Sequence, residues 1–173
     1  MSRLFGPMRQ IGYVVRDIEK AMLDWSNVCG IGPWFYNEKA NFESVTYNGK
    51  DCSNLQISLA FANSGDIQIE LIQQRCNTPS MYLEFLAGGK EGMQHWSSWP
   101  ENYHEIYKRA LEQGHTVLLE GMNPRGPFAY FKNEGLQGSV VEISQLTPGR
   151  RGFFDMVREA AVNWDGRDPI RPV

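Results

Sequence analysis

The residues of this chain that could do chemistry are one histidine, two glutamates and one glutamine, which fall at matching places in its two halves. Gln10 lies near the start of the first half, and His95 holds the equivalent place in the second. Glu70 and Glu142 each interrupt an aliphatic run near the end of a half. The same order of residues in both halves indicates that the four side chains serve one site.

A divalent metal ion would explain this set of residue types. A glutamate in an aliphatic strand is costly to bury unless it is paired, protonated or bound to metal, although either glutamate could instead lie on a solvated sheet face. Histidine nitrogen, carboxylates and a glutamine carbonyl suit Zn, Ni, Co, Mn or Mg. Such an ion stabilises the oxyanion of a chelated carbonyl compound, and a neighbouring carboxylate can remove the adjacent proton.

The first half of the chain reads as a β-α-β-β-β unit. Residues 8–15 alternate as a strand does, and apolar side chains recur at helical spacing up to Gly30, which ends the helix. Trp25 belongs to that stripe and is expected to be core. A turn leads into residues 34–36, and strands follow near residues 42–47 and 53–62 and then at the segment that carries Glu70.

The second half repeats this order and ends with the strand of Glu142, and such duplication indicates a repeated structural unit. Because alternate strand residues share one face, a curled sheet would let the four residues converge. We therefore expect an α+β fold, with two tandem βαβββ modules forming a curled eight-stranded mixed sheet cup, plus a C-terminal helix.

We expect a single domain over residues 1–173. Its parts are module one at 8–75, a linker at 76–91 with one short helix, module two at 92–147 and a helical tail at 150–173. Apolar spacing predicts the tail helix at 152–164. Since this helix belongs to neither repeat, it should cover a sheet face, a dimer contact or the mouth of the site.

Composition limits the classes of binding partner that can be expected. A net charge of −3 and a pI near 5.6 give no electrostatic reason to expect nucleic acid or an anionic membrane. No apolar run approaches the roughly 20 residues of a membrane span, and the first residues lack the apolar core of a signal peptide. The three cysteines are widely spaced, which favours reduced thiols and a cytoplasmic location.

Both halves resemble the vicinal oxygen chelate superfamily, which includes glyoxalase I, methylmalonyl-CoA epimerase, extradiol dioxygenases and bleomycin-resistance proteins. The resemblance covers about residues 8–146, and it lies in the segments Gln10-Ile11-Gly12-Tyr13-Val14-Val15-Arg16-Asp17-Ile18-Glu19-Lys20-Ala21, Ile69-Glu70-Leu71, Met93-Gln94-His95 and Val141-Glu142-Ile143. These segments are fairly specific for the fold. They are weakly specific for the reaction, because members of one scaffold do different chemistry.

The resemblance implies a site for one divalent metal ion, held by Gln10, Glu70, His95 and Glu142. In some glyoxalase I enzymes a similar set binds the metal and its glutamates also act as base, so Glu142 and Glu70 are the implied catalytic residues. Tyr130 matches an aromatic residue that often faces the pocket and is the implied substrate contact. A homodimer is a further expectation from the resemblance.

The branches of the superfamily fit this chain unequally. Epimerases use an extra glutamate from an earlier strand, where this chain offers only Asp51 and Ser53. Extradiol dioxygenases need two histidines, and Gln10 takes the place of one. The basic residues expected to hold glutathione in glyoxalase I are not recognisable. Trp34, Trp96, Trp99 and Phe61 suggest an aromatic-bearing substrate, although most should be core residues, and His104 and His115 are expected at the surface.

The leading hypothesis is a metal-dependent isomerase, epimerase or lyase that removes a proton alpha to a metal-chelated carbonyl, through an enolate or enediolate. Glu142 is the expected base. The substrate would be a small carbonyl compound, with thioesters and aromatic-bearing compounds among the candidates. The alternatives are a glyoxalase I-like lactoylglutathione lyase and a non-catalytic binding or resistance protein of the same fold.

Overall fold

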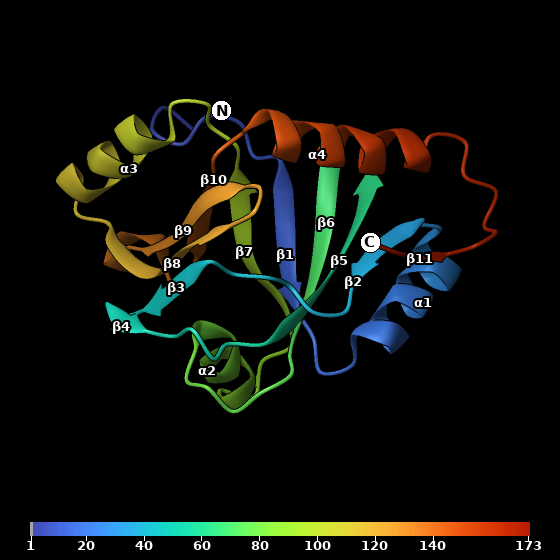
Figure 1. Cartoon of the computed structure of the whole chain (residues 1–173), viewed down its shortest axis with the longest axis horizontal. Helices are drawn as coiled ribbons and strands as arrows, with labels where there is room; N and C mark the ends of the chain where they lie inside the picture. The colour runs from blue at the N-terminus through green and yellow to red at the C-terminus, as the bar shows by residue number, and fades with distance from the viewer. Residues whose placement is uncertain (1) are drawn as a thin grey trace.

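The computed structural model describes residues 2–173, in which both halves of the chain build one mixed sheet (Figure 1). The first half supplies β1 (Gln10–Val14), β2 (Trp34–Asn37), β5 (Ile57–Ser64) and β6 (Ile67–Gln74), and the second supplies β7 (Gly92–Ser98), β8 (Thr116–Asn123), β9 (Gly126–Lys132) and β10 (Val140–Ser144). Their order is β2-β5-β6-β1-β7-β10-β9-β8, so corresponding strands lie on either side of the central β1–β7 pair. The expected α+β fold, with a curled mixed sheet and a helix in each half, is confirmed.

The expected number of eight strands is wrong, because the sheet described has eleven. A hairpin of β3 (Ser44–Tyr47) and β4 (Lys50–Asp51) is inserted between β2 and β5 and pairs with β8 of the other half. Its turn is Asn48-Gly49, both with positive φ, as a type I′ hairpin turn requires. At the opposite edge, β11 (Ile170–Pro172) pairs with β2.

Two helices cover the outer face of the sheet. Helix α1 (Ile18–Cys29) packs on the first half, with its N-terminus capped by the side chain of Asp17. Helix α3 (Tyr103–Glu112) packs on the second half. Leu71 and Ile143 belong to these outer clusters, and because strand side chains alternate, their neighbours Glu70 and Glu142 face the inner side.

The inner side is closed by α2 (Met81–Ala87), and by α4 (Pro148–Ala161), which runs across the ends of the central strands (Figure 1). Thr147 caps α4 and Pro148 occupies its first turn, so this helix begins four residues before the predicted position 152. Val157 of α4 packs with Phe35 and Phe61, which shows that the tail helix covers the inner sheet face. Among the described helices, none is long and apolar enough to cross a membrane.

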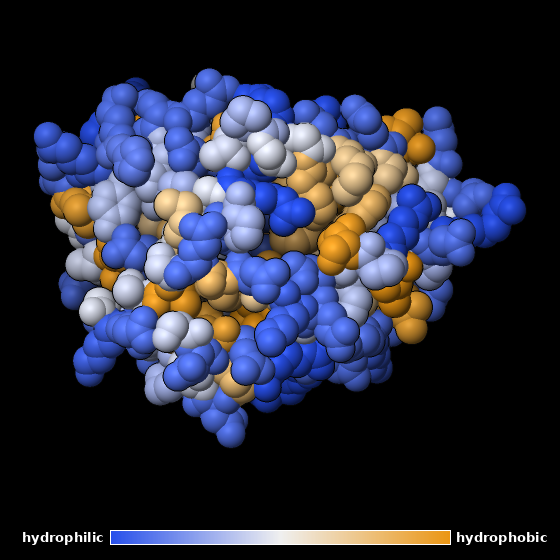
Figure 2. Space-filling view, in the orientation of Figure 1, coloured by the Kyte–Doolittle hydropathy of each residue, from blue (hydrophilic) through white to orange (hydrophobic). Residues whose placement is uncertain are grey.

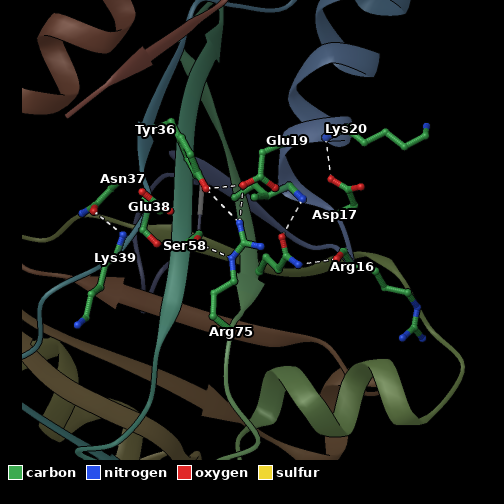
Figure 3. A network of polar contacts seen from close by, with 12 residues as sticks. Arg16, Asp17, Glu19, Lys20, Tyr36, Asn37, Glu38, Lys39, Ser58 and Arg75 are labelled. Atoms are coloured by element: carbon green, nitrogen blue, oxygen red, sulfur yellow. Dashed lines mark hydrogen bonds and ion pairs between the residues drawn. The ribbon is translucent and has the colours of Figure 1, made fainter.

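A polar network fixes α1 to the strands of the first half (Figure 3). The guanidinium of Arg75, just after β6, lies 2.6 Å from Glu19 of α1 and donates a hydrogen bond to Ser58 of β5. The hydroxyl of Tyr36 on β2 donates to the same carboxylate at 2.7 Å. The network therefore ties together three strands and a helix beside Asn37, which lines the inner cavity.

Candidate metal centre

Three side chains from three strands meet on the inner face of the sheet. His95 Nε2 lies 3.5 Å from Glu70 Oε2 and 3.7 Å from Glu142 Oε2. One ligand atom from each residue lies within 4.8 Å of the other two. All three residues are buried, and these same three atoms have no hydrogen-bond partner among the described residues. Buried polar atoms are rarely left without a partner, and these three residues form a group that could hold a metal ion.

Gly12 creates the space that the His95 ring occupies. It lies in β1, directly opposite both Glu70 of β6 and His95 of β7. A Cβ atom at this position would lie 1.9 Å from Cε1 of the imidazole and 2.2 Å from its Nε2. Only glycine lets the ring lie over β1. The sequence signal for this role is a glycine inside a strand, which often marks a close approach by another group.

A bulge in β7 brings Gln94 beside the histidine. The β1–β7 register passes from Gly12↔His95 to Tyr13↔Met93, so Gln94 has no partner in β1. Bulges re-aim side chains, and here Gln94 Oε1 lies 2.7 Å from His95 Nδ1. A carbonyl oxygen only accepts, so Nδ1 carries the proton and the lone pair of Nε2 faces the two carboxylates.

Burial makes the charged forms of these three side chains unfavourable, and a bound cation would stabilise the charged carboxylates. Burial lowers the pKa of His95 to about 4, against the opposing effect of Glu142, so the imidazole is neutral at pH 7. Burial raises the pKa of Glu70 to about 8, although the charge of Arg150 lowers it. Burial and then the charge of Glu70 raise the pKa of Glu142. A divalent ion would relieve these costs, and the histidine and carboxylates are ligand types that such ions accept.

Gln10 lies on the same inner face and lines the cavity next to Glu70 and Glu142. It is buried, and its side-chain nitrogen donates to Gln68 Oε1 at 2.7 Å. That hydrogen bond fixes the amide and leaves the carbonyl oxygen as its free end. A role for Gln10 as a fourth ligand stays a prediction.

A cavity of about 130 Å³ opens beside the cluster, between α4, the β8–β9 turn and the inner strands. Tyr130, opposite Glu142 in the β9–β10 register, lines it and holds its ring edge-on to His95, with 4.9 Å between the ring centres. Phe61 also lines the cavity, whereas Trp34 and Trp96 pack in the outer clusters. The predicted contact residue Tyr130 is therefore positioned to meet a ligand.

Several other sequence candidates lie away from the cluster. Asp51 is exposed on β4, at the edge of the sheet, and is not part of the cavity wall. His104 is exposed, as expected. His115 is partly exposed, with its ring edge-on to Phe5.

Arg150 is a residue of the site that the sequence pattern did not reveal. It was expected in the tail before the helix, but it lies in the first turns of α4, almost fully buried. Its guanidinium donates four hydrogen bonds, to Asn123 Oδ1 and to the carbonyls of Gly126, Pro127 and Gln145. Arg150 thereby attaches α4 to the β8–β9 turn and lines the cavity. The Thr147-Pro148 start signal would have placed it inside the helix.

Comparisons with known proteins agree with this architecture. A hypothetical protein from Bacillus halodurans superposes with a TM-score of 0.61 at 16% identity, over 82% of this chain and 94% of the other. Methylmalonyl-CoA epimerase from Mycobacterium tuberculosis gives 0.61 at 14% identity, over 88% and 95%. A Streptomyces coelicolor methylmalonyl-CoA epimerase variant bound to 2-nitronate-propionyl-CoA gives 0.57 at 12%, over 82% and 95%. At these identities the likeness shows the fold alone.

The sequence comparisons identify the family. No curated protein matches the chain by sequence. Residues 9–131, well over half of the chain, match the glyoxalase/bleomycin resistance protein/dioxygenase superfamily. The match includes Gln10, Glu70, His95 and Tyr130 and ends before Glu142. Together with the paired β-α-β-β-β halves, it shows that this chain belongs to the glyoxalase/bleomycin resistance protein/dioxygenase superfamily.

Proposed function

We propose that this protein is a metal-dependent isomerase, epimerase or lyase that removes a proton from the carbon next to a chelated carbonyl. One observation carries the proposal: three buried ligand atoms, from Glu70, His95 and Glu142, face one another without a hydrogen-bond partner. A binding protein has no need to bury two carboxylates around a neutral histidine. A catalyst that stabilises negative charge on a substrate oxygen does.

The proposed metal is one divalent ion of the type Zn, Ni, Co, Mn or Mg, held by Glu70, His95 and Glu142, with the carbonyl oxygen of Gln10 as fourth ligand. When bound, the ion would supply Lewis-acid stabilisation of the developing oxyanion. Gln94 keeps Nδ1 of His95 protonated and so keeps the Nε2 lone pair available. Gln68 fixes the side-chain amide of Gln10.

Glu142 is the proposed general base. Ser144 donates a hydrogen bond to Glu142 Oε1 at 2.8 Å, which fixes the carboxylate, while Oε2 has no partner. Glu142 also lines the cavity, so its carboxylate can reach a proton on a substrate carbon held there. Glu142 would take the proton from the substrate carbon and return it to the same or a neighbouring carbon. Glu70 is a ligand and the partner base.

Proton exchange tests this function. Hydroxyacetone and simple acyl thioesters are incubated with Zn-, Ni-, Co- or Mn-loaded protein in heavy water, and loss of the alpha-proton signal is followed by NMR. Exchange is expected with the wild type, and Glu142→Gln should reduce its rate by about 100-fold or more, the size of a general-base contribution. Glu120→Gln is the matched control, because Glu120 lies on β8 outside the cavity wall.

If the Glu142→Gln variant exchanges the alpha-proton as fast as the wild type, Glu142 is not the base. Tight ligand binding without exchange, unaffected by chelator, would instead favour the non-catalytic binding or resistance protein. The glyoxalase I-like lactoylglutathione lyase stays an alternative within the same chemistry. The homodimer and the cytoplasmic location stay predictions.

A further inference from the structure

The cavity beside the metal centre contains an arginine that is held in place and has no protein partner. The backbone N–H of Arg125 donates to Asn123 Oδ1 at 2.9 Å, and its carbonyl accepts from Thr147 Oγ1 at 2.6 Å. Its guanidinium lies 4.2 Å from the centre of the Phe153 ring of α4. Among the described residues, none forms a side-chain hydrogen bond or an ion pair with this guanidinium. The backbone and the ring fix the cation at the cavity wall with its donors unused.

The surroundings of Arg125 are apolar on one side and cationic on the other. Phe61, Phe153 and Phe154 form a cluster of aromatic rings that line the cavity, with ring centres 5.5 to 6.3 Å apart. Buried Arg150 adds a second positive charge, without a carboxylate within ion-pair distance in the part of the chain described. Figure 2 shows apolar and hydrophilic side chains gathered side by side on the face that carries α4.

The acidic groups of the cavity lie at its other end. Glu70 and Glu142 are buried in the metal centre, whereas Arg125 is exposed at the β8–β9 turn. A ligand that reaches from the metal centre to the outside therefore passes from the cluster of metal ligands, along aromatic rings, to a free guanidinium. A planar guanidinium recognises carboxylates through two parallel hydrogen bonds.

We propose that the substrate is an organic acid: a carbonyl compound with an apolar skeleton and a carboxylate distant from the chelated oxygens, and that Arg125 binds this carboxylate. The proposal deepens the proposed function and rests on it for the position of the carbonyl. The carboxylate contact itself does not depend on the metal ion, because Arg125 is not one of the proposed ligands.

The test compares an acid with its neutral ester. Benzoylpropionate joins an aryl ketone to a carboxylate, and its methyl ester removes only the charge. Binding of both compounds is measured by calorimetry, with metal-loaded and with chelator-treated protein. The wild type should bind the acid about 10-fold more tightly than the ester, the size of one charge-assisted contact. Arg125→Met keeps a stem that packs on Phe153 and should abolish this preference.

Two controls separate the possible failures. Arg151→Met removes an exposed cation of α4 that pairs with Glu101, and it should leave the preference for the acid unchanged. Equal binding of acid and ester by the wild type, or a preference that survives in Arg125→Met, would overturn the assignment. Inorganic phosphate that displaces the acid at low concentration would also overturn it, in favour of a phosphate site. If the protein binds no metal, the proposed function fails while the chelator-treated comparison still tests Arg125.

Discussion

The substitution Gly12→Ala tests how the sheet positions the histidine. The added methyl group would lie 1.9 Å from His95 Cε1, 2.2 Å from Nε2 and 2.5 Å from Nδ1. Carbon atoms in contact are separated by about 3.5 Å or more, so the ring would have to retreat by roughly 1.5 Å. It has little room to do so, because His95 is 1% exposed and Tyr130 lies edge-on against it.

The expected effect of Gly12→Ala has two parts. Overpacking at a buried site costs about 1–3 kcal/mol of folding stability, measured by urea unfolding of chelator-treated protein. The displaced ring no longer presents Nε2 to the carboxylates, so affinity for Zn should fall by about 100-fold or more, measured by competition with a chromophoric chelator. Gly152→Ala on α4 is the matched control, because an added Cβ there meets nothing within 4 Å.

A double variant shows whether the cause is the clash with the ring. In a His95→Ala background the space above Gly12 is empty, so the stability cost of Gly12→Ala should largely disappear. A Zn affinity of Gly12→Ala within a few-fold of the wild type would refute the reasoning. So would a stability cost of Gly12→Ala that is as large in the His95→Ala background as in the wild type. This cycle stays informative even if the single variant folds poorly.

Three further predictions follow from the contacts around the site. Gln94→Leu removes the acceptor of the His95 Nδ1 proton, so nitrogen NMR of metal-free protein should show a mixture of tautomers, and Zn affinity should fall roughly 10–100-fold. Arg150→Met leaves buried carbonyls without donors and should cost about 2–4 kcal/mol in urea unfolding, whereas Arg151→Met should be near neutral. Equal costs would contradict the inference that Arg150 attaches α4 to the β8–β9 turn. Burial raises the pKa of Glu70 from 4.5 to about 8, so the folded metal-free protein binds that proton more tightly and loses stability as pH rises through this range. Burial lowers the pKa of His95 from 6.5 to about 4, which offsets this loss below pH 6.5, whereas the raised pKa of Glu142 adds to the loss. Stability is therefore expected to fall between pH 6.5 and 8, by up to about 1.4 kcal/mol per pH unit from Glu70 alone. Glu70→Gln should flatten that fall, and an unchanged pH profile in this variant would contradict the assignment.

The sequence predicted the centre of the sheet because local patterns determine it. Alternation around Glu70 and Glu142 places both on one face whatever the strands pair with, and the repeat fixes which strands correspond. Their convergence with His95 followed from those two facts. Strand β3 falls within the extended segment predicted near residues 42–47, but its hairpin with β4 and its pairing with β8 were not predicted. The pairing with β8 joins residues far apart in the sequence, although Asn48-Gly49 is a recognisable hairpin turn.

Other features depend on contacts that no local pattern reveals. The bulge at Gln94 exists only relative to the register of β1, so the sequence of β7 alone does not show it. The need for glycine at position 12 arises from the His95 ring above it, a contact that the local sequence does not show. Arg150 is buried by contacts with the β8–β9 turn, which α4 meets only in the folded chain. Three of its hydrogen-bond acceptors lie 23 to 27 residues away in the sequence, so no local pattern indicates its burial. A tail arginine would otherwise be expected in solvent.

The most direct test of the account is the metal content of protein purified without added metal and then offered Zn, Ni, Co or Mn, followed by dialysis and elemental analysis. The account predicts about one equivalent of divalent metal per chain in the wild type and little in His95→Ala, with His104→Ala retaining the wild-type amount because His104 lies exposed outside the cluster. Metal absent from the wild type after all four ions have been offered, or retained in full by His95→Ala, would contradict the claim that Glu70, His95 and Glu142 form a metal centre.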